Sequence, residues 1–183
     1  MRTRKPAPPL DESALYNYAV KLLGQQMRTV AELKRLLRRR IEPGEAGEAA
    51  LAAVVARLKE YKFLDDTGYA RDYAKLRQEN SSFGRRRVRQ DLMRKGVHAE
   101  VIEETLATAY EGVEEEALAR RHLERKRIPQ PATEKEAARV ARLLVRAGFS
   151  PGAIFRILKQ WNVDDAALAS MESLDTDEHP PEG

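Results

Sequence analysis

Arginine is concentrated in one short stretch, SSFGRRRVRQDLMRKG at residues 81–96. This stretch contains six cations and a single acid, Asp91. Two smaller basic groups lie before and after it in the chain. A planar guanidinium donates paired hydrogen bonds to carboxylates and phosphates, so these groups predict contact with an anionic partner. The predicted partner-binding cations are Arg85, Arg86, Arg87, Arg89, Arg94, Lys95, Arg35, Arg38, Arg39, Arg120, Arg121 and Arg125.

The central arginine stretch has two interpretations. A run of charge on a helix is most often a solvated face, here opposite the apolar Val88 and Leu92. We favour a functional surface because residues 71–95 hold nine basic residues against three acidic ones. Bound single-stranded DNA also requires aromatic side chains for stacking, and the stretch contains one aromatic residue, Phe83. An acidic protein groove with occasional phosphate contacts therefore fits at least as well as DNA.

Other functional side chains do not form a recognisable catalytic or metal site. Asp65 and Asp66 are adjacent acids, but no further ligand or base accompanies them, so they are predicted to cap a helix. The chain has no cysteine, and its three histidines are far apart. It has neither a glycine-rich phosphate loop nor a nucleophile with a neighbouring base. We therefore expect no enzymatic activity, cofactor or metal.

Charge is unevenly distributed along the 183 residues, although the net charge is only +4. Residues 98–119 hold seven glutamates, and residues 162–183 hold seven acids; neither block contains lysine or arginine. Such blocks create local fields that the net charge conceals. No apolar run approaches the roughly 20 residues of a membrane helix, and the first residues lack the apolar core of a secretory signal. A cytoplasmic protein without membrane contact is expected.

Apolar residues recur at helical spacing throughout, and alternating strand patterns are nearly absent. Capping signals mark the helix boundaries. Thr29 and Glu32 form a capping box. Gly96 predicts a left-handed helix end, and Gly148 ends a later helical stretch. Ser150, which precedes a proline, predicts the start of another helix.

The helical pattern repeats three times. Similar junctions occur at LLRRRI, LMRKGV and LVRAGF, where apolar residues and a cation precede a turn and another apolar residue. Repeats of about 50 residues that bury shared surface form solenoid-like arrays. The sequence therefore predicts an all-α protein, an elongated and curved array of three tandem three-helix repeats. The predicted divisions are a flexible arm at 1–11, repeats at 12–64, 65–112 and 113–165, and an acidic, disordered tail at 166–183.

Two stretches of the middle repeat resemble the RecX family, bacterial regulators of the RecA recombinase. FLDDTGYARDYAKLR at 63–77 resembles that family's paired acid followed by an aromatic–alanine helix that ends in arginine. SSFGRRRVRQDLMRKGV at 81–97 resembles its pattern of glycine, basic pair, apolar residue, acid–leucine and lysine–glycine. The resemblance covers residues 12–165. It departs in the first repeat, where Arg40 stands at a position that is commonly glycine.

The resemblance implies a helical protein that binds in the groove of a RecA filament on single-stranded DNA. Such binding opposes filament growth, ATP hydrolysis, strand exchange and co-protease activity. We expect a monomer that contacts the filament through its basic clusters, with weak direct DNA binding in addition. If the repeats stack with constant rotation, the three clusters line one long face. The alternative is a helical nucleic-acid-binding protein that acts on DNA without a recombinase.

Overall fold

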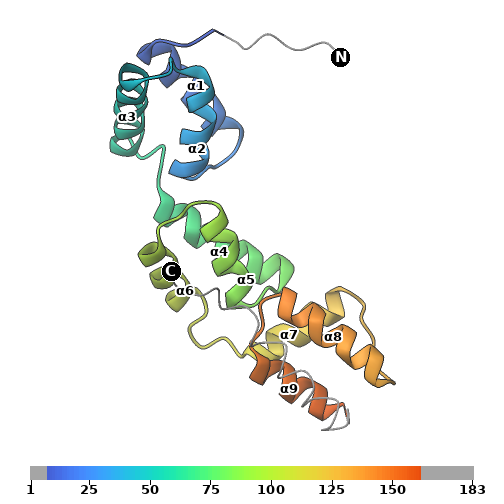
Figure 1. The fold of residues 1–183 in the computed structure, drawn as a ribbon. Coiled ribbons are helices and arrows are strands. Elements are labelled where there is room, and N and C mark those ends of the chain that lie inside the picture. Colours follow the sequence, from blue (N-terminus) through green and yellow to red (C-terminus); the bar gives the residue numbers. More distant parts are fainter. Residues whose placement is uncertain (1–7, 162–183) are drawn as a thin grey trace, which may run out of the picture. The chain divides into compact units, whose positions relative to one another are not determined.

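A computed structural model describes residues 8–161, and every regular element in this range is a helix (Figure 1). The predicted all-α class is therefore confirmed. None of these helices is both long and apolar enough to cross a membrane. In chain order they are α1 (Glu12–Gln25), α2 (Val30–Leu37), the 3-10 helix η1 (Arg38–Arg40), α3 (Glu45–Glu60), α4 (Asp66–Ser81), α5 (Arg85–Arg94), α6 (Ala99–Ala109), α7 (Glu115–Arg125), α8 (Glu134–Arg146) and α9 (Pro151–Gln160).

Polar side chains close the free ends of several helices. The predicted capping box begins α2: the Thr29 hydroxyl accepts a hydrogen bond from the Glu32 amide, and the Glu32 carboxylate accepts one from the Thr29 amide. Ser150 begins α9 in the predicted way, because its hydroxyl accepts from the Ala153 amide. These contacts satisfy backbone N–H groups that have no partner within the helix.

The chain divides into two compact units. Unit 1 includes residues 8–72 and 92–105, and unit 2 includes residues 73–91 and 106–161. The boundary between them passes through α4, α5 and α6, so each of these helices contributes residues to both units. The division into repeats at 12–64, 65–112 and 113–165 stays a prediction. The predicted arm lies partly outside the residues that the structure describes, and the predicted tail lies wholly outside them.

The core of unit 1 is built by α1, α2 and α3, which pack against one another (Figure 1). Each helix has an apolar stripe at helical spacing, and the stripe is the face that is buried. Leu15 of α1, Leu33 and Leu37 of α2, and Leu51 and Leu58 of α3 are almost wholly removed from solvent. Burial of these side chains, at about 1.5–3 kcal/mol each, is the main source of stability for this unit.

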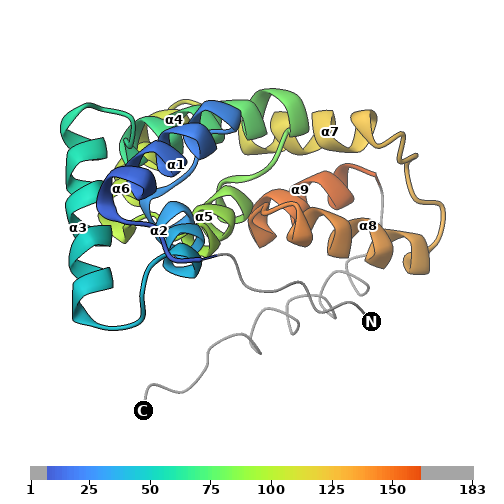
Figure 2. The same cartoon turned by 90° about the horizontal axis from the view of Figure 1, so that it is seen from above.

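The core of unit 2 is built by α7, α8 and α9. Helix α9 packs on both of the others, and it lies beside α8 in Figure 2. Leu118 of α7, Leu144 of α8 and Ile157 of α9 meet in this core with Phe149, which lies in the turn between α8 and α9. Phe149 is only 1% exposed. The turn is therefore anchored by its own aromatic side chain, and this anchoring fixes the position of Gly148 beside it.

Candidate partner-binding surface

The predicted arginine surface lies on α5. Two apolar side chains, Val88 and Leu92, hold this helix against the rest of the fold, and both are completely buried. The other faces carry the cations. The arginines exposed on α5 are Arg85, Arg86, Arg89 and Arg94, whereas Arg87 is partly buried.

The N-terminal end of α5 is positioned within unit 2 by the turn between α8 and α9. The Gly84 amide donates to the Ala147 carbonyl at 2.8 Å, and the Arg86 amide donates to the Gly148 carbonyl at 3.2 Å. Gly148 has φ +88°, and a Cβ placed on it would lie 2.8 Å from Arg87 Cα and closer still to the Arg87 amide. Two backbones therefore meet here without intervening side chains, and we call this contact the Gly148 junction.

A buried histidine adjoins the Gly148 junction. His122 of α7 is 3% exposed, and its Nδ1 donates to the Ser81 carbonyl at 2.8 Å. Its ring centroid lies 5.7 Å from that of Phe83 and 6.0 Å from that of Phe149. Burial lowers the pKa of His122, although the Ser81 carbonyl opposes this shift. The imidazole is therefore a neutral structural group that helps to hold the turn before α5.

The C-terminal end of α5 is positioned within unit 1 by the start of α2. The Thr29 hydroxyl donates to the Lys95 carbonyl at 2.6 Å while it also caps α2. Gly96 has φ +75°, and a Cβ placed on it would overlap the methyl group of Ala31. Lys95 Nζ lies 3.0 Å from Glu32 Oε1. We call these three contacts together the Gly96 junction. They are made mainly by side chains, whereas the Gly148 junction is made by backbone atoms.

The surroundings of two ionisable groups in unit 1 shift their pKa values. Burial alone would lower the pKa of Lys95, but its contacts with Tyr69 and Glu32 raise that pKa above its ordinary value. Burial raises the pKa of Asp66, and the hydrogen bond that its carboxylate accepts from the Val30 amide at 2.9 Å partly offsets the rise. Lys95 is thus a charged structural contact, and Asp66 is a second polar link to the start of α2.

The paired aspartates have separate roles. As predicted, Asp65 caps α4, because its Oδ1 accepts from the amides of Thr67 and Gly68, each at 3.0 Å. Asp66 instead reaches α2, a contact that the sequence does not reveal. Among the residues that the structure describes, no group of three or more side chains could hold a metal ion.

The excess of cations in residues 71–95 does not leave the cations of α5 without partners inside the fold. Arg87 Nε lies 3.3 Å from the Asp91 carboxylate, which also accepts from the Tyr73 hydroxyl at 3.2 Å. Lys95 is paired with Glu32, which lies 63 positions away in the chain. Arg85, Arg86, Arg89 and Arg94 also make interactions within the fold. The α5 cations therefore belong to a network of contacts, and an external anion would add to that network or compete with it.

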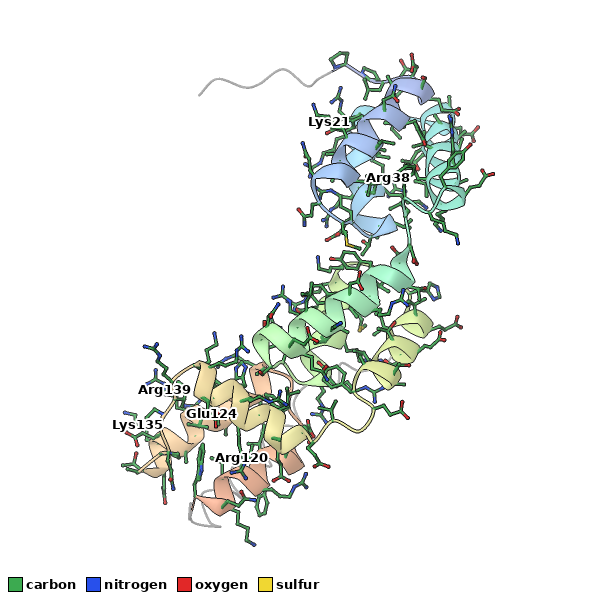
Figure 3. All side chains as sticks on the ribbon, turned by 180° about the vertical axis from the view of Figure 1, so that it is seen from behind. Lys21, Arg38, Arg120, Glu124, Lys135 and Arg139 are labelled. Atoms are coloured by element: carbon green, nitrogen blue, oxygen red, sulfur yellow. The ribbon has the colours of Figure 1, made fainter. Side chains whose placement is uncertain are left out.

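The other two basic clusters combine exposed and internally bonded side chains. In unit 1, Arg35 and Arg39 are exposed, whereas Arg38 makes a two-point contact with the Glu48 carboxylate at 3.0 and 3.3 Å. Arg38, labelled in Figure 3, is itself exposed. In unit 2, Arg120 donates to the Gln160 side chain and Arg125 donates to the Glu79 carbonyl at 3.0 Å, while Arg121 is exposed. A common face for the three clusters stays a prediction.

Comparison with known proteins places the chain among regulatory proteins. The model of the RecX second three-helix domain matches residues 65–106. A regulatory protein RecX from Myxococcus xanthus is 36% identical over 86% of this chain and 88% of its own length. Another from Mycolicibacterium vanbaalenii is 32% identical over 76% of this chain and 77% of its own length. The crystal structure of RecX from Lactobacillus salivarius aligns with a TM-score of 0.65 at 22% identity, over 83% of this chain and 97% of that one.

Proposed function

Because the chain belongs to the RecX family of regulatory proteins, we propose that it regulates RecA recombinase filaments by binding in the filament groove. Bound there, it opposes filament growth, ATP hydrolysis, strand exchange and co-protease activity. It acts as a cytoplasmic monomer and needs no catalytic site of its own. The regulatory names of its relatives support this class of function.

The observation that carries the proposal is the fixed presentation of arginines on α5. Val88 and Leu92 are completely buried, and both ends of the helix are held by junctions. A contact helix that is already ordered loses little conformational freedom when it binds. Arg85, Arg86 and Arg89 are exposed on it. Their planar guanidinium groups suit carboxylates of a protein groove and phosphates of the DNA within it.

Inhibition of the DNA-dependent ATPase of RecA by substoichiometric amounts of this protein tests the proposal. We expect inhibition of preformed filaments, and we expect the triple variant Arg85→Glu/Arg86→Glu/Arg89→Glu to inhibit at least tenfold less strongly, since a lost contact to a charged partner costs about 1.5–3 kcal/mol. Full inhibition by this variant would exclude α5 as the contact surface.

A matched control separates the contact from general charge. The control variant carries Lys21→Glu, Lys75→Glu and Lys159→Glu, which change the net charge equally at exposed positions outside the proposed surface. We expect it to retain inhibition. Tight binding to bare DNA with no effect on preformed filaments would instead favour a nucleic-acid-binding protein that acts without a recombinase.

A further inference from the structure

A second row of cations lies on α8 in unit 2, outside the three clusters that the sequence singled out. Its spacing of four, three and four residues places every member on one face of the helix. All four side chains are exposed, and the opposite face, with Val140 and Leu144, is buried in the core. We call this row the α8 cation stripe; it consists of Lys135, Arg139, Arg142 and Arg146.

The stripe differs from the other basic clusters in its contacts. Within residues 8–161, no ion pair or side-chain hydrogen bond joins any of its four side chains to another residue. By contrast, each of the three clusters has a member that is bonded within the fold: Arg38 to Glu48, Arg87 to Asp91, and Arg125 to the Glu79 carbonyl. Lys135 lies in the first turn of α8 and Arg139 near its middle, and both are labelled in Figure 3.

The positive charges of the stripe repel one another along α8. Cations three or four residues apart on a helix face one another, and like charges at these spacings destabilise the helix. Glu136 lies three residues before Arg139 and offsets part of this repulsion, while its carboxylate also accepts from the Ala132 amide; the last three cations have no acid between them. Arg146 lies in the last turn of α8, where the helix dipole favours a cation, but no described residue forms an ion pair with any member of the stripe. An anion bound along the row would relieve the remaining repulsion.

We propose that the α8 cation stripe binds the phosphate backbone of single-stranded nucleic acid. The first and last cations, Lys135 and Arg146, are 11 positions apart, or about 16 Å along a straight helix axis at 1.5 Å per residue. A flexible strand can follow such a straight row, whereas each backbone of a duplex curves away around its axis. Guanidinium groups match phosphate oxygens in pairs, and Val145, which is 56% exposed beside Arg142 and Arg146, offers an apolar surface to a base.

The stripe shares no residue with the arginines assigned above to the filament, and its test contains no recombinase. The probe is a fluorescently labelled oligothymidylate of about 20 nucleotides, which exceeds the length that one small binding domain covers. Its anisotropy is titrated with the full chain at several salt concentrations. The stripe variant carries Lys135→Gln, Arg139→Gln, Arg142→Gln and Arg146→Gln.

A control of equal charge isolates the stripe. It carries Lys21→Gln, Lys59→Gln, Lys75→Gln and Lys159→Gln, all at exposed positions. We expect the stripe variant to bind at least about tenfold more weakly than the control near 50 mM salt. We also expect the slope of log K against log salt to be smaller in magnitude by about 3, because each of four phosphate contacts on a single strand contributes about 0.7.

Three results would overturn the assignment: equal losses in the stripe and control variants, equal binding of a duplex of the same length, or equal competition by polyglutamate. A further variant guards against misfolding. Arg139→Lys/Arg142→Lys/Arg146→Lys keeps every charge, so it should keep the steep salt dependence while it loses part of the affinity that paired guanidinium contacts provide. A shallow salt dependence in this variant would also contradict the proposal.

Discussion

The Gly96 and Gly148 junctions arise from similar sequences, LMRKGV and LVRAGF, but they are held together differently. Each places a left-handed glycine against the start of a helix that is distant in the chain. At Gly96 the nearest group is the methyl of Ala31, and the Thr29 hydroxyl bonds the turn. At Gly148 the nearest atoms are the backbone of Arg87. The comparison shows that the glycine is required for two separate reasons, its φ and its neighbour, and that only the neighbour differs.

The largest effect is expected for Gly148→Ala. A methyl group there would press on the Arg87 amide, Cα and Cβ, and backbone cannot move aside as a side chain can. The φ of +88° adds strain of its own. We expect a loss of roughly 3–5 kcal/mol in the free energy of unfolding. Guanidinium denaturation followed by fluorescence of Trp161 measures this loss, because the single tryptophan packs on the core of unit 2.

Gly112→Ala is the control that separates strain from crowding. Gly112 also has a positive φ, +65°, but a Cβ added there would meet no atom within 4 Å. We expect a loss of only about 1 kcal/mol from the backbone conformation. Similar losses for both variants would mean that the close approach of Gly148 to Arg87 contributes little.

Gly96→Ala should have a smaller effect than Gly148→Ala, at about 2–3 kcal/mol, because the obstacle is one methyl group and not a helix backbone. The double variant Gly96→Ala/Ala31→Gly removes that methyl group. We expect the double variant to recover part of the lost free energy of unfolding, although the strain of the positive φ remains. Ala31→Gly alone should lower the free energy of unfolding by up to about 1 kcal/mol, because glycine disfavours the helical conformation of α2. Urea denaturation followed by circular dichroism measures both; absence of any recovery would show that Ala31 is not the obstacle.

Thr29→Val tests the side-chain character of the Gly96 junction. The substitution keeps the shape of a completely buried residue but removes the cap of α2 and the hydrogen bond to Lys95. We expect a loss of about 1–2 kcal/mol in the free energy of unfolding. Thr29→Ser retains the hydroxyl and should lose clearly less. If both variants had equal stability in the same denaturant series, the hydroxyl would not be what holds this junction.

Local signals in the sequence predicted the elements of both junctions but not their partners. The capping box at Thr29, the end of a helix at Gly148 and the start of α9 at Ser150 each depend on a few neighbouring residues, and all are confirmed. The contact of Gly96 with Ala31 joins residues 65 positions apart, and no local pattern encodes it. Similar junction sequences indicated a repeated arrangement without showing which helix each turn meets.

The same limit applies to the candidate surface. The arginines of α5 were found from their density, and the burial of Val88 and Leu92 was found from helical spacing. Their internal partners could not be found, because Glu32 pairs with Lys95 only after the chain has folded. The sequence also gave no sign of the role of His122, because its distance from the other two histidines says only that they share no site; the side chain is buried against two aromatic rings.

The smallest effect is a dependence of stability on pH through His122, beside the Gly148 junction. Its pKa is lowered in the folded chain, so the unfolded chain takes up a proton first as the pH falls. The contribution of neutral His122 to stability is therefore fully present above the ordinary histidine pKa of about 6.5, and it declines as the pH falls below that value. Arg125 and Lys126 disfavour the charged imidazole further, whereas the Thr29 hydroxyl of the Gly96 junction does not titrate.

His122→Asn keeps a donor for the Ser81 carbonyl but cannot be protonated in this range. We compare unfolding of both proteins by Trp161 fluorescence from about pH 8 to about pH 5.5, the interval in which histidine changes charge. The variant should be less stable at the higher pH, because it leaves space between Phe83 and Phe149, and the difference should narrow as the pH falls. Carboxylates titrate in both proteins alike, so a constant difference across this interval would show that the buried imidazole does not set the pH response of the junction.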